Sequence, residues 1–232
     1  MEDCCATNVL NETNHHLVII GGGSAAFAAA TRASEMGHRV TMINAGLPIG
    51  GTCVNVGCVP SKTLIRAAES HHRANQNRFN GIESHSKVVD FGAVIAQELE
   101  LVEQLRQAKY LDVIGDVPSI RVVQGRASFV SSNTVKVDDE QISGSRFLIA
   151  TGATTYVPPI RGLAEVDYLT NQTAFELTAL PPSMIVLGGR YIALECAQMF
   201  ARFGCKVTVL QRSDRILPNE APDLTGELTS YL

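Results

Sequence analysis

The chain has 232 residues, enough for one full domain and part of a second. Hydrophobic residues make up 45% of it and charged residues 18%, a balance that supports a buried core and excludes disordered, collagenous and coiled-coil proteins. The net charge is −4 and no long basic run occurs, so nucleic acid is not expected as a partner. No apolar stretch approaches the roughly 20 residues of a membrane span, and the acidic start is unlike a secretory signal, so we expect a cytoplasmic protein with no membrane partner.

Residues 1–14 are polar, and we expect them to form a disordered N-terminal tail. The tail contains the adjacent Cys4 and Cys5, whose thiolates would suit a soft metal ion, although a functionally silent tail is the simpler interpretation. For His15 and His16 we favour surface positions over metal binding. Six cysteines in a chain of this length are too few for a secreted disulfide framework, so any pairing would serve redox or metal chemistry.

The first structural motif is a strand, a glycine-rich turn, a helix and a second strand. Apolar runs predict the strands over residues 17–20 and 40–43. Gly21, Gly23 and Ala26 in the turn match G-x-G-x-x-(G/A), in which the glycines allow a tight turn and the close approach of a pyrophosphate. Because both strands accompany the turn, we predict a dinucleotide site rather than a chance glycine cluster.

The start of the helix in this motif is expected to face the phosphates, with Ser24 and Ala25 in its first turn. Asn44 stands where an acidic residue usually closes the second strand and holds the ribose. Its amide oxygen would accept the same hydrogen bond, without the extra strength of a charged acceptor.

Residues 50–62 read Gly-Gly-Thr-Cys-Val-Asn-Val-Gly-Cys-Val-Pro-Ser-Lys, with four residues between Cys53 and Cys58. Two such thiols would be able to close a small redox disulfide. A zinc site needs two further ligands at matching spacing, which are not nearby, so zinc is the weaker interpretation. A pair of buried structural cysteines would leave the flanking glycines unexplained. Lys62 and the start of the following helix would both lower a thiol pKa and favour the reactive thiolate.

This segment resembles the pyridine-nucleotide-disulfide oxidoreductases, and the wording of residues 53–69 is most similar to the mercuric reductase branch of that family. The resemblance covers nearly everything from His15 onward. It implies that Cys58 is the thiol next to an FAD cofactor and that Cys53 is the interchange thiol that meets the substrate. It also implies that Lys62 lies beside the reactive flavin nitrogen.

The middle of the chain is expected to complete the flavin domain. Apolar residues at helical spacing between residues 90 and 109 predict a packing helix. Short runs then predict a small antiparallel sheet that returns to the main sheet, over residues 120–123, 129–130, 135–137 and 146–149. By the resemblance, further flavin contacts come from Gly51, Thr52, Thr151 and Gly152.

A second strand, glycine turn, helix and strand follow over residues 184–210, and this repeat suits an enzyme that passes a hydride from nicotinamide to flavin. The turn is Gly188-Gly189-Arg190, and Arg190 replaces the second glycine, where it would clash with a pyrophosphate or add a phosphate contact. Arg212 follows the last strand and Arg215 is close to it, which favours NADPH over NADH.

The resemblance gives two further residues of this repeat a role. Glu195 would pair with Lys62 near the flavin. Tyr191 would lie over the flavin and move aside for nicotinamide.

These features predict an α/β protein in two parts. Residues 15–180 would form a Rossmann-like FAD-binding domain with a parallel sheet, a small antiparallel sheet and the redox disulfide. Residues 181–232 would begin a second, incomplete Rossmann-like NAD(P)H-binding domain. Prolines at 158, 159, 181 and 182 are consistent with a boundary between them.

The resemblance implies an enzyme in which NADPH reduces FAD, FAD reduces the Cys53–Cys58 disulfide, and the two thiolates bind Hg(II) while it is reduced to Hg(0). The full-length form would be a homodimer. Two alternatives stay open: a disulfide reductase related to dihydrolipoyl dehydrogenase or glutathione reductase, and a truncated fragment that binds flavin or metal without turnover.

Overall fold

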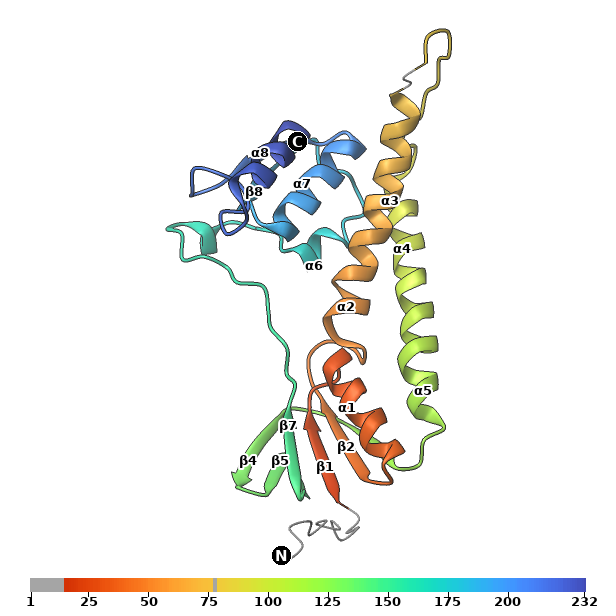
Figure 1. Ribbon diagram of the computed structural model, residues 1–232, viewed down its shortest axis with the longest axis vertical. Coiled ribbons are helices and arrows are strands. Elements are labelled where there is room, and N and C mark those ends of the chain that lie inside the picture. The colour runs from red at the N-terminus through yellow and green to blue at the C-terminus, as the bar shows by residue number, and fades with distance from the viewer. Residues whose placement is uncertain (1–14, 77–78) are drawn as a thin grey trace, which may run out of the picture. The chain divides into compact units, whose positions relative to one another are not determined.

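The computed structural model describes residues 15–76 and 79–232 (Figure 1). The tail residues 1–14, with Cys4 and Cys5, lie outside the described residues. The chain divides into two compact units. We call the first, which joins the residues up to Gly51 with Ala108–Gly152, the sheet unit; the second, which joins Thr52–Gln107 with Ala153–Leu232, is the helical unit.

The sheet unit is built around four parallel strands in the order β3-β2-β1-β7. Helix α1 (Ser24–Glu35) connects the first two strands, which confirms the predicted strand-helix-strand motif. The sheet strands are β1 (His16–Ile20), β2 (Arg39–Asn44), β3 (Ile120–Gln124) and β7 (Arg146–Ile149). Parallel strands are usually covered on both faces, and the continuous apolar runs of β1 and β2 suit that position.

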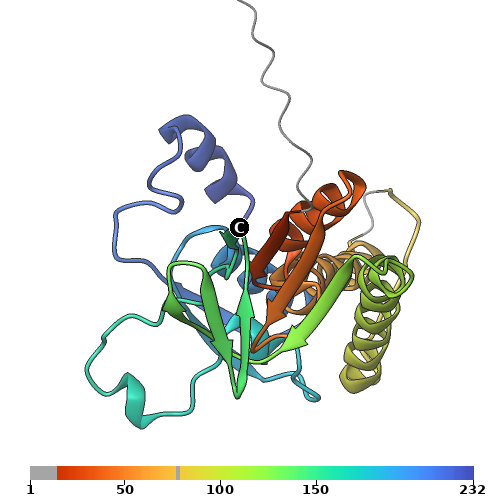
Figure 2. The same ribbon diagram turned by 90° about the horizontal axis from the view of Figure 1, so that it is seen from below.

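Alternating residues of β1 and β2 fill two separate cores, one on each face of this sheet. Ile19 and Met42 pack under α1, whose small residues Ala26 and Ala30 allow the helix to approach closely. On the other face Val18 and Ile43 pack against a second, antiparallel sheet. Figure 2 shows both sheets from below.

The antiparallel sheet has the order β4-β5-β6, which confirms the predicted small sheet but changes its membership. Its strands are β4 (Ala127–Ser131), β5 (Thr134–Val137) and β6 (Glu140–Ser143). The runs expected at 120–123 and 146–149 belong to the parallel sheet instead, as β3 and β7. Strand β6 was not predicted because Ile142 is its one apolar residue; Ile142 pairs with Val135 and is buried with it.

The helical unit contains three long helices and the second strand-helix-strand motif. Its helices are α2 (Gly51–Asn55), α3 (Cys58–Asn75), α4 (Phe91–Arg106), α6 (Asn171–Ala174), α7 (Tyr191–Phe203) and α8 (Pro222–Ser230), with a 3-10 turn at Leu163–Glu165. Strands β8 (Ser183–Leu187) and β9 (Lys206–Leu210) are parallel. The predicted packing helix is α4, and the chain continues through a π-helical turn (Gln107–Leu111) into α5 (Asp112–Gly115).

One apolar core joins α3, α4 and α7. Phe91 of α4 meets Phe203 of α7 edge-on, with ring centroids 5.3 Å apart, and Leu64 of α3 is fully buried in the same cluster. Cys205 also belongs to this cluster, and Cys196 packs against it, so both thiols act as small apolar side chains. Burial raises the pKa of Cys205 and, together with the neighbouring Glu195, raises that of Cys196 to about 11.

Within the described residues, no helix is both long enough and apolar enough to cross a membrane.

Helix α4 also buries a carboxyl group. The Glu98 side chain is 1% exposed, and neither of its oxygens has a hydrogen-bond partner among the described residues. Burial, and to a lesser extent the charge of Glu176, raises the pKa of Glu98 to about 7. The folded state therefore keeps a proton that the unfolded chain releases at a lower pH.

We expect Glu98→Gln to reduce the loss of stability that accompanies rising pH. Below the ordinary glutamate pKa the group is protonated in both the folded and the unfolded state, so it adds no pH dependence to the stability. Above pH 7 it lowers the free energy of unfolding by up to about 3 kcal/mol, because its pKa is raised from 4.5 to about 7. Urea unfolding at about pH 5 and about pH 8 would measure this difference. Glu100→Gln, an exposed position on the same helix, is the control. Equal pH dependence in the two variants would contradict the assignment.

Candidate active site

The first glycine turn, in the sheet unit, admits no side chain at its first position. Gly21 has φ +137° and its N–H donates to Ile43 O at 2.8 Å. A Cβ on Gly21 would lie 2.1 Å from Ala150 O, at the end of β7. Thr151 and Gly152 follow directly, so the last residues of this unit leave the sheet at the edge where the turn lies. Ligands of α/β sheets bind at this edge.

The start of α1 is suited to an anion. Its N-cap is Gly23, which has no side chain to cap the helix, and the first turn carries no acidic residue. The N–H of Phe27 is the first to bond within the helix, to Gly23 O at 3.0 Å. The preceding amides of Ser24, Ala25 and Ala26 have no acceptor within the helix, as at any helix N-terminus.

A second glycine segment lies against this turn. Gly50 pairs with Gly23, and its N–H donates to Gly22 O at 2.8 Å. A Cβ on Gly51 would lie 2.6 Å from the Gly23 Cα. The two segments therefore form a surface of backbone alone beside a helix N-terminus, and these residues fit the pyrophosphate of a dinucleotide.

Asn44 lies at the end of β2 and is 5% exposed. Its amide nitrogen donates to Leu47 O at 3.0 Å and to Gln124 Oε1 at 3.2 Å. The amide oxygen faces the turn, since a Cβ on Gly22 would lie 2.2 Å from Asn44 Oδ1. This orientation agrees with an acceptor at the turn; the hydrogen bond to a ribose stays a prediction.

The two cysteines of the motif lie on either side of a tight turn in the helical unit. Cys53 is in α2 and half-buried, whereas Cys58 is exposed and is the first residue of α3; both are free thiols in this structure. Gly57, between them, caps α3 without a side chain, and a Cβ there would lie 2.9 Å from Thr52 O. Cys58 therefore occupies the N-terminus of α3.

The pKa of Cys53 is raised, chiefly by a hydrogen bond with the Cys58 side chain and then by burial. Lys62 is not among the influences that shift the pKa of Cys53. The hydrogen bond to the Cys58 side chain and the partial burial both favour the protonated form of Cys53.

Lys62, one turn along α3 from Cys58, pairs with a residue of α7. Its Nζ lies 2.6 Å from Glu195 Oε1, and both side chains are about half exposed. The structure thus brings together two residues that are 133 positions apart in the sequence. Their placement beside a flavin stays a prediction.

The turn of the second motif repeats the geometry of the first. Gly188 has φ +112° and donates to Leu210 O at 2.8 Å. Gly189 donates to Gln211 Oε1 at 2.9 Å, and Gln211 follows β9 just as Asn44 ends β2. Both motifs therefore place an amide side chain against the middle residue of their turn.

The remaining predicted residues of this motif lie around that turn. Arg190 is the exposed N-cap of α7, and Tyr191, 58% exposed, donates its hydroxyl hydrogen to Glu220. Arg212 is exposed, while Arg215 donates to Pro218 O at 2.8 Å. Sequence reasoning missed Glu220, because no local pattern links it to a tyrosine 29 residues earlier.

Two long-range hydrogen bonds that the sequence did not reveal hold the chain between the cysteines. Arg106 Nη1 donates to Asn55 Oδ1 at 3.1 Å, and Asn171 Nδ2 donates to Val56 O at 3.2 Å. The C-terminal end of α2 is therefore held in place by one side chain of α4 and one of α6.

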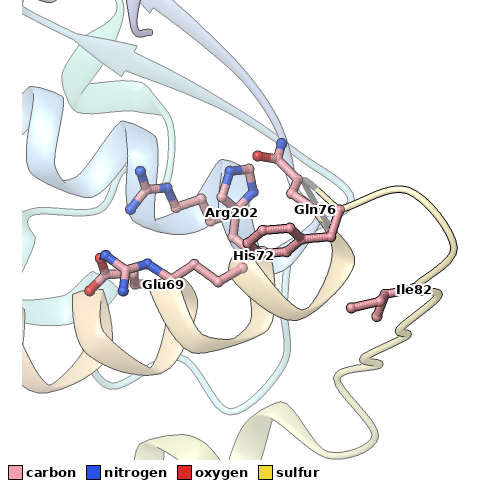
Figure 3. Close-up of a pocket in the computed structure, with 7 residues that line it drawn as sticks. Glu69, His72, Gln76, Ile82 and Arg202 are labelled. Atoms are coloured by element: carbon pink, nitrogen blue, oxygen red, sulfur yellow. The ribbon is translucent and has the colours of Figure 1, made fainter.

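We find no second candidate active site elsewhere among the described residues. They contain no group of three or more His, Cys, Asp or Glu side chains able to hold a metal ion. An open surface pocket of the helical unit, shown in Figure 3, contains none of the predicted site residues. It is lined by Glu69, His72, Arg73, Gln76, Phe79, Ile82 and Arg202.

Comparison with known proteins agrees with this geometry. The chain is 44% identical to a mercuric reductase of Lysinibacillus sphaericus over 224 residues, which are 97% of this chain and 41% of that protein. It is 43% identical to one of Staphylococcus aureus, over 89% of this chain and 38% of the relative. The chain thus spans less than half the length of these relatives.

Among solved structures, the HOCl-induced flavoprotein disulfide reductase RclA from Escherichia coli superposes with a TM-score of 0.81. The two are 34% identical, and the match covers 94% of this chain and 46% of that one. Residues 15–232 match the family described as pyridine nucleotide-disulphide oxidoreductase. The glycine turns, the dithiol and these similarities lead to one conclusion: the chain belongs to the pyridine nucleotide-disulphide oxidoreductase family.

Proposed function

We propose that this chain carries the FAD-binding and dithiol part of an enzyme that uses NADPH to reduce Hg(II) to Hg(0). The observation that supports this most directly is the Cys53–Cys58 pair, two neighbouring thiols of which Cys58 begins an 18-residue helix and Cys53 lies in the short helix before it. The 44% identity to a mercuric reductase supports mercury as the substrate.

FAD would be held by residues of both glycine segments. The backbone surface formed by Gly21, Gly23 and Gly51 suits its pyrophosphate, and the amides of Ser24 to Ala26 would donate to it. Asn44 would accept from the ribose, while Thr52, Thr151 and Gly152 would lie nearer the flavin. When bound, FAD supplies the means to take two electrons from NADPH and transfer them onward.

The two thiols would have separate roles. Cys58, at the helix N-terminus, would lie against the flavin, and Cys53 would meet the substrate. As thiolates, both are soft ligands and suit a soft metal ion such as Hg(II). Over the whole reaction, NADPH and Hg(II) give NADP⁺, H⁺ and Hg(0), with two electrons passing from the nicotinamide to the metal.

NADPH would bind at the second glycine turn. Gln211 directly follows β9, where an acidic residue would select NADH, and Arg212 is the next residue, whose guanidinium suits a 2′-phosphate. Arg190, exposed at the N-cap of α7, would add a phosphate contact. Tyr191 would cover the flavin and move aside for nicotinamide, and the Lys62–Glu195 pair would lie near the flavin nitrogen.

The wider assignments rest on the family. We infer that residues 15–180 act as the FAD-binding domain and that residues 181–232 begin the NAD(P)H-binding domain. The full-length protein would be a cytoplasmic homodimer, in a compartment where thiols stay reduced.

A second candidate is a flavoprotein disulfide reductase with another terminal substrate. It is supported by the match to RclA, a flavoprotein disulfide reductase whose structure was also solved as a Cu(II) complex. Comparing the oxidation of NADPH with Hg(II), Cu(II) and a small disulfide as acceptors would separate the two candidates.

The visible absorption spectrum of the purified 232-residue chain, with FAD added, tests the cofactor and the cysteines together. We expect a bound-flavin spectrum, with a long-wavelength band after anaerobic two-electron reduction, because a thiolate at Cys58 would donate charge to the flavin. Cys58→Ala should lose this band, and the control Cys205→Ala, in the apolar core, should keep it. A protein that stays colourless would contradict FAD binding by this chain.

Gly51→Ala should weaken FAD binding by at least about tenfold, because the added methyl group would meet Gly23 Cα at 2.6 Å. Gly46→Ala is a matched control: Gly46 also has a positive φ, +80° against +64° for Gly51, but a Cβ there meets nothing within 4 Å. Titration of each variant with FAD, followed by flavin fluorescence, measures the affinity. Equal losses in both variants would mean that backbone strain, rather than the close approach of the two glycines, determines binding.

A further inference from the structure

The loop between β9 and α8, residues 211–221, is fastened to the turn that precedes α7. The N–H of Leu217 donates to Gly189 O at 2.8 Å, and the side chain of Gln211 accepts from Gly189 N at 2.9 Å. Gly189 is buried, and a Cβ on it would lie 3.2 Å from both Gln211 and Ile216. The glycine therefore allows the loop to pack on the turn.

This attachment fixes Glu220. Leu217 has φ +43°, a left-handed conformation that is uncommon for a residue with a side chain, and its carbonyl accepts from the N–H of Glu220 at 2.9 Å. Arg215 closes the same stretch by donating to Pro218 O at 2.8 Å. The backbone of Glu220 is thus held by a chain of hydrogen bonds that begins at Gly189.

Glu220 in turn accepts a hydrogen bond from the Tyr191 hydroxyl. Tyr191 is the first residue of α7, so this bond joins the loop to the helix. Both residues line a small hollow of about 60 Å³, whose other lining residues are Arg190 and residues 217–219. The Tyr191 ring, held by its hydrogen bond to Glu220, therefore forms part of the wall of this hollow.

We propose that Glu220 is a positioning residue that holds Tyr191 over this hollow, and that nicotinamide must release the tyrosine in order to bind. The proposal rests on the proposed function, in which Tyr191 moves aside for nicotinamide. A charged acceptor makes a stronger hydrogen bond than a neutral one, so a carboxylate is suited to hold a phenol that is otherwise 58% exposed. Because only the released form binds, the closed form lowers the apparent affinity for NADPH by the fraction of time it is closed.

The charges around the phenol agree with this arrangement. Glu220 raises the pKa of Tyr191, mainly through the hydrogen bond, and the charge of Arg190 acts in the opposite direction. The bond to Glu220 is thus the dominant influence on the hydroxyl.

The first test is a titration that needs no cofactor. The chain has 5 tyrosines, so the phenolate absorbance of Tyr191 is obtained by subtracting the curve of Tyr191→Phe from that of the parent chain. We expect Tyr191 to titrate above the ordinary tyrosine pKa, and to return towards it in Glu220→Ala. Glu227→Gln, which removes an exposed charge from α8, should leave the titration unchanged. An unchanged titration in Glu220→Ala would overturn the proposal.

The second test is a double-mutant cycle on NADPH affinity. Glu220→Ala and Tyr191→Phe each break the bond from one side, so each should tighten NADPH binding by about fivefold, and the double variant should be no tighter than either. Glu220→Gln keeps an acceptor and should give a smaller gain. Tyr231→Phe, at an exposed tyrosine of the same unit, is the control and should give none.

The cycle separates positioning from simple charge repulsion. If Glu220 only repelled the anionic NADPH, Glu220→Gln would match Glu220→Ala and Tyr191→Phe would have no effect, which would overturn the proposal. If no variant bound NADPH, the proposed nicotinamide site would fail and the gating role with it. The tyrosine titration would then still show whether Glu220 holds Tyr191.

Discussion

The close contact between the two glycine segments, Gly23 against Gly51, is the constraint on which the candidate active site depends. It leaves no space for a side chain on Gly51, and it sets a backbone surface beside the start of α1. The same contact fixes where α2 begins, and Cys53 follows two residues later in that helix. Gly51, which is suited to a cofactor, and Cys53, which is suited to redox chemistry, therefore belong to one short segment. A displacement of Gly51 would also displace Cys53.

The two strand-helix-strand motifs share a detail that separates them from the usual dinucleotide pattern. Each has an amide side chain where an acidic residue is common: Asn44 is the last residue of β2, and Gln211 directly follows β9. Both amides contact the middle residue of their own glycine turn, Gly22 or Gly189. In the second motif the amide oxygen accepts a hydrogen bond from the turn. In the first, the amide nitrogen donates to Leu47 and to Gln124 of β3, and the amide oxygen faces the glycine. In the second motif the amide thus fastens the turn, whereas in the first it fastens the end of β2 to Leu47 and to Gln124.

The sequence predicted those structural elements that follow from the spacing of apolar residues along the chain. Both strand-helix-strand motifs and the helix at α4 follow from apolar spacing, and the cysteine segment is distinctive enough to indicate its family. Prediction failed where partners are distant in the chain. Strands β3 and β7 were assigned to the antiparallel sheet because a short run does not reveal its partner, and β6 was missed because Ile142 is its one apolar residue. The pairing of Lys62 with Glu195 was expected only from the family resemblance, not from any local pattern. The raised pKa of Cys53 was not expected at all, because its causes are the contact with the Cys58 side chain and burial.

The backbone between the two cysteines is held by groups that take no part in thiol chemistry. Arg106 and Asn171 bind Asn55 and Val56 from separate helices, and the carbonyl of Thr52 leaves no room for a side chain on Gly57. None of these contacts depends on whether the sulfur atoms are joined. Making or breaking a bond between them would therefore need side-chain rotation without refolding of the loop. In the proposed enzyme, a dithiol mounted on such a fixed backbone would have little to rearrange when it is oxidised or reduced, which suits a pair that must cycle many times.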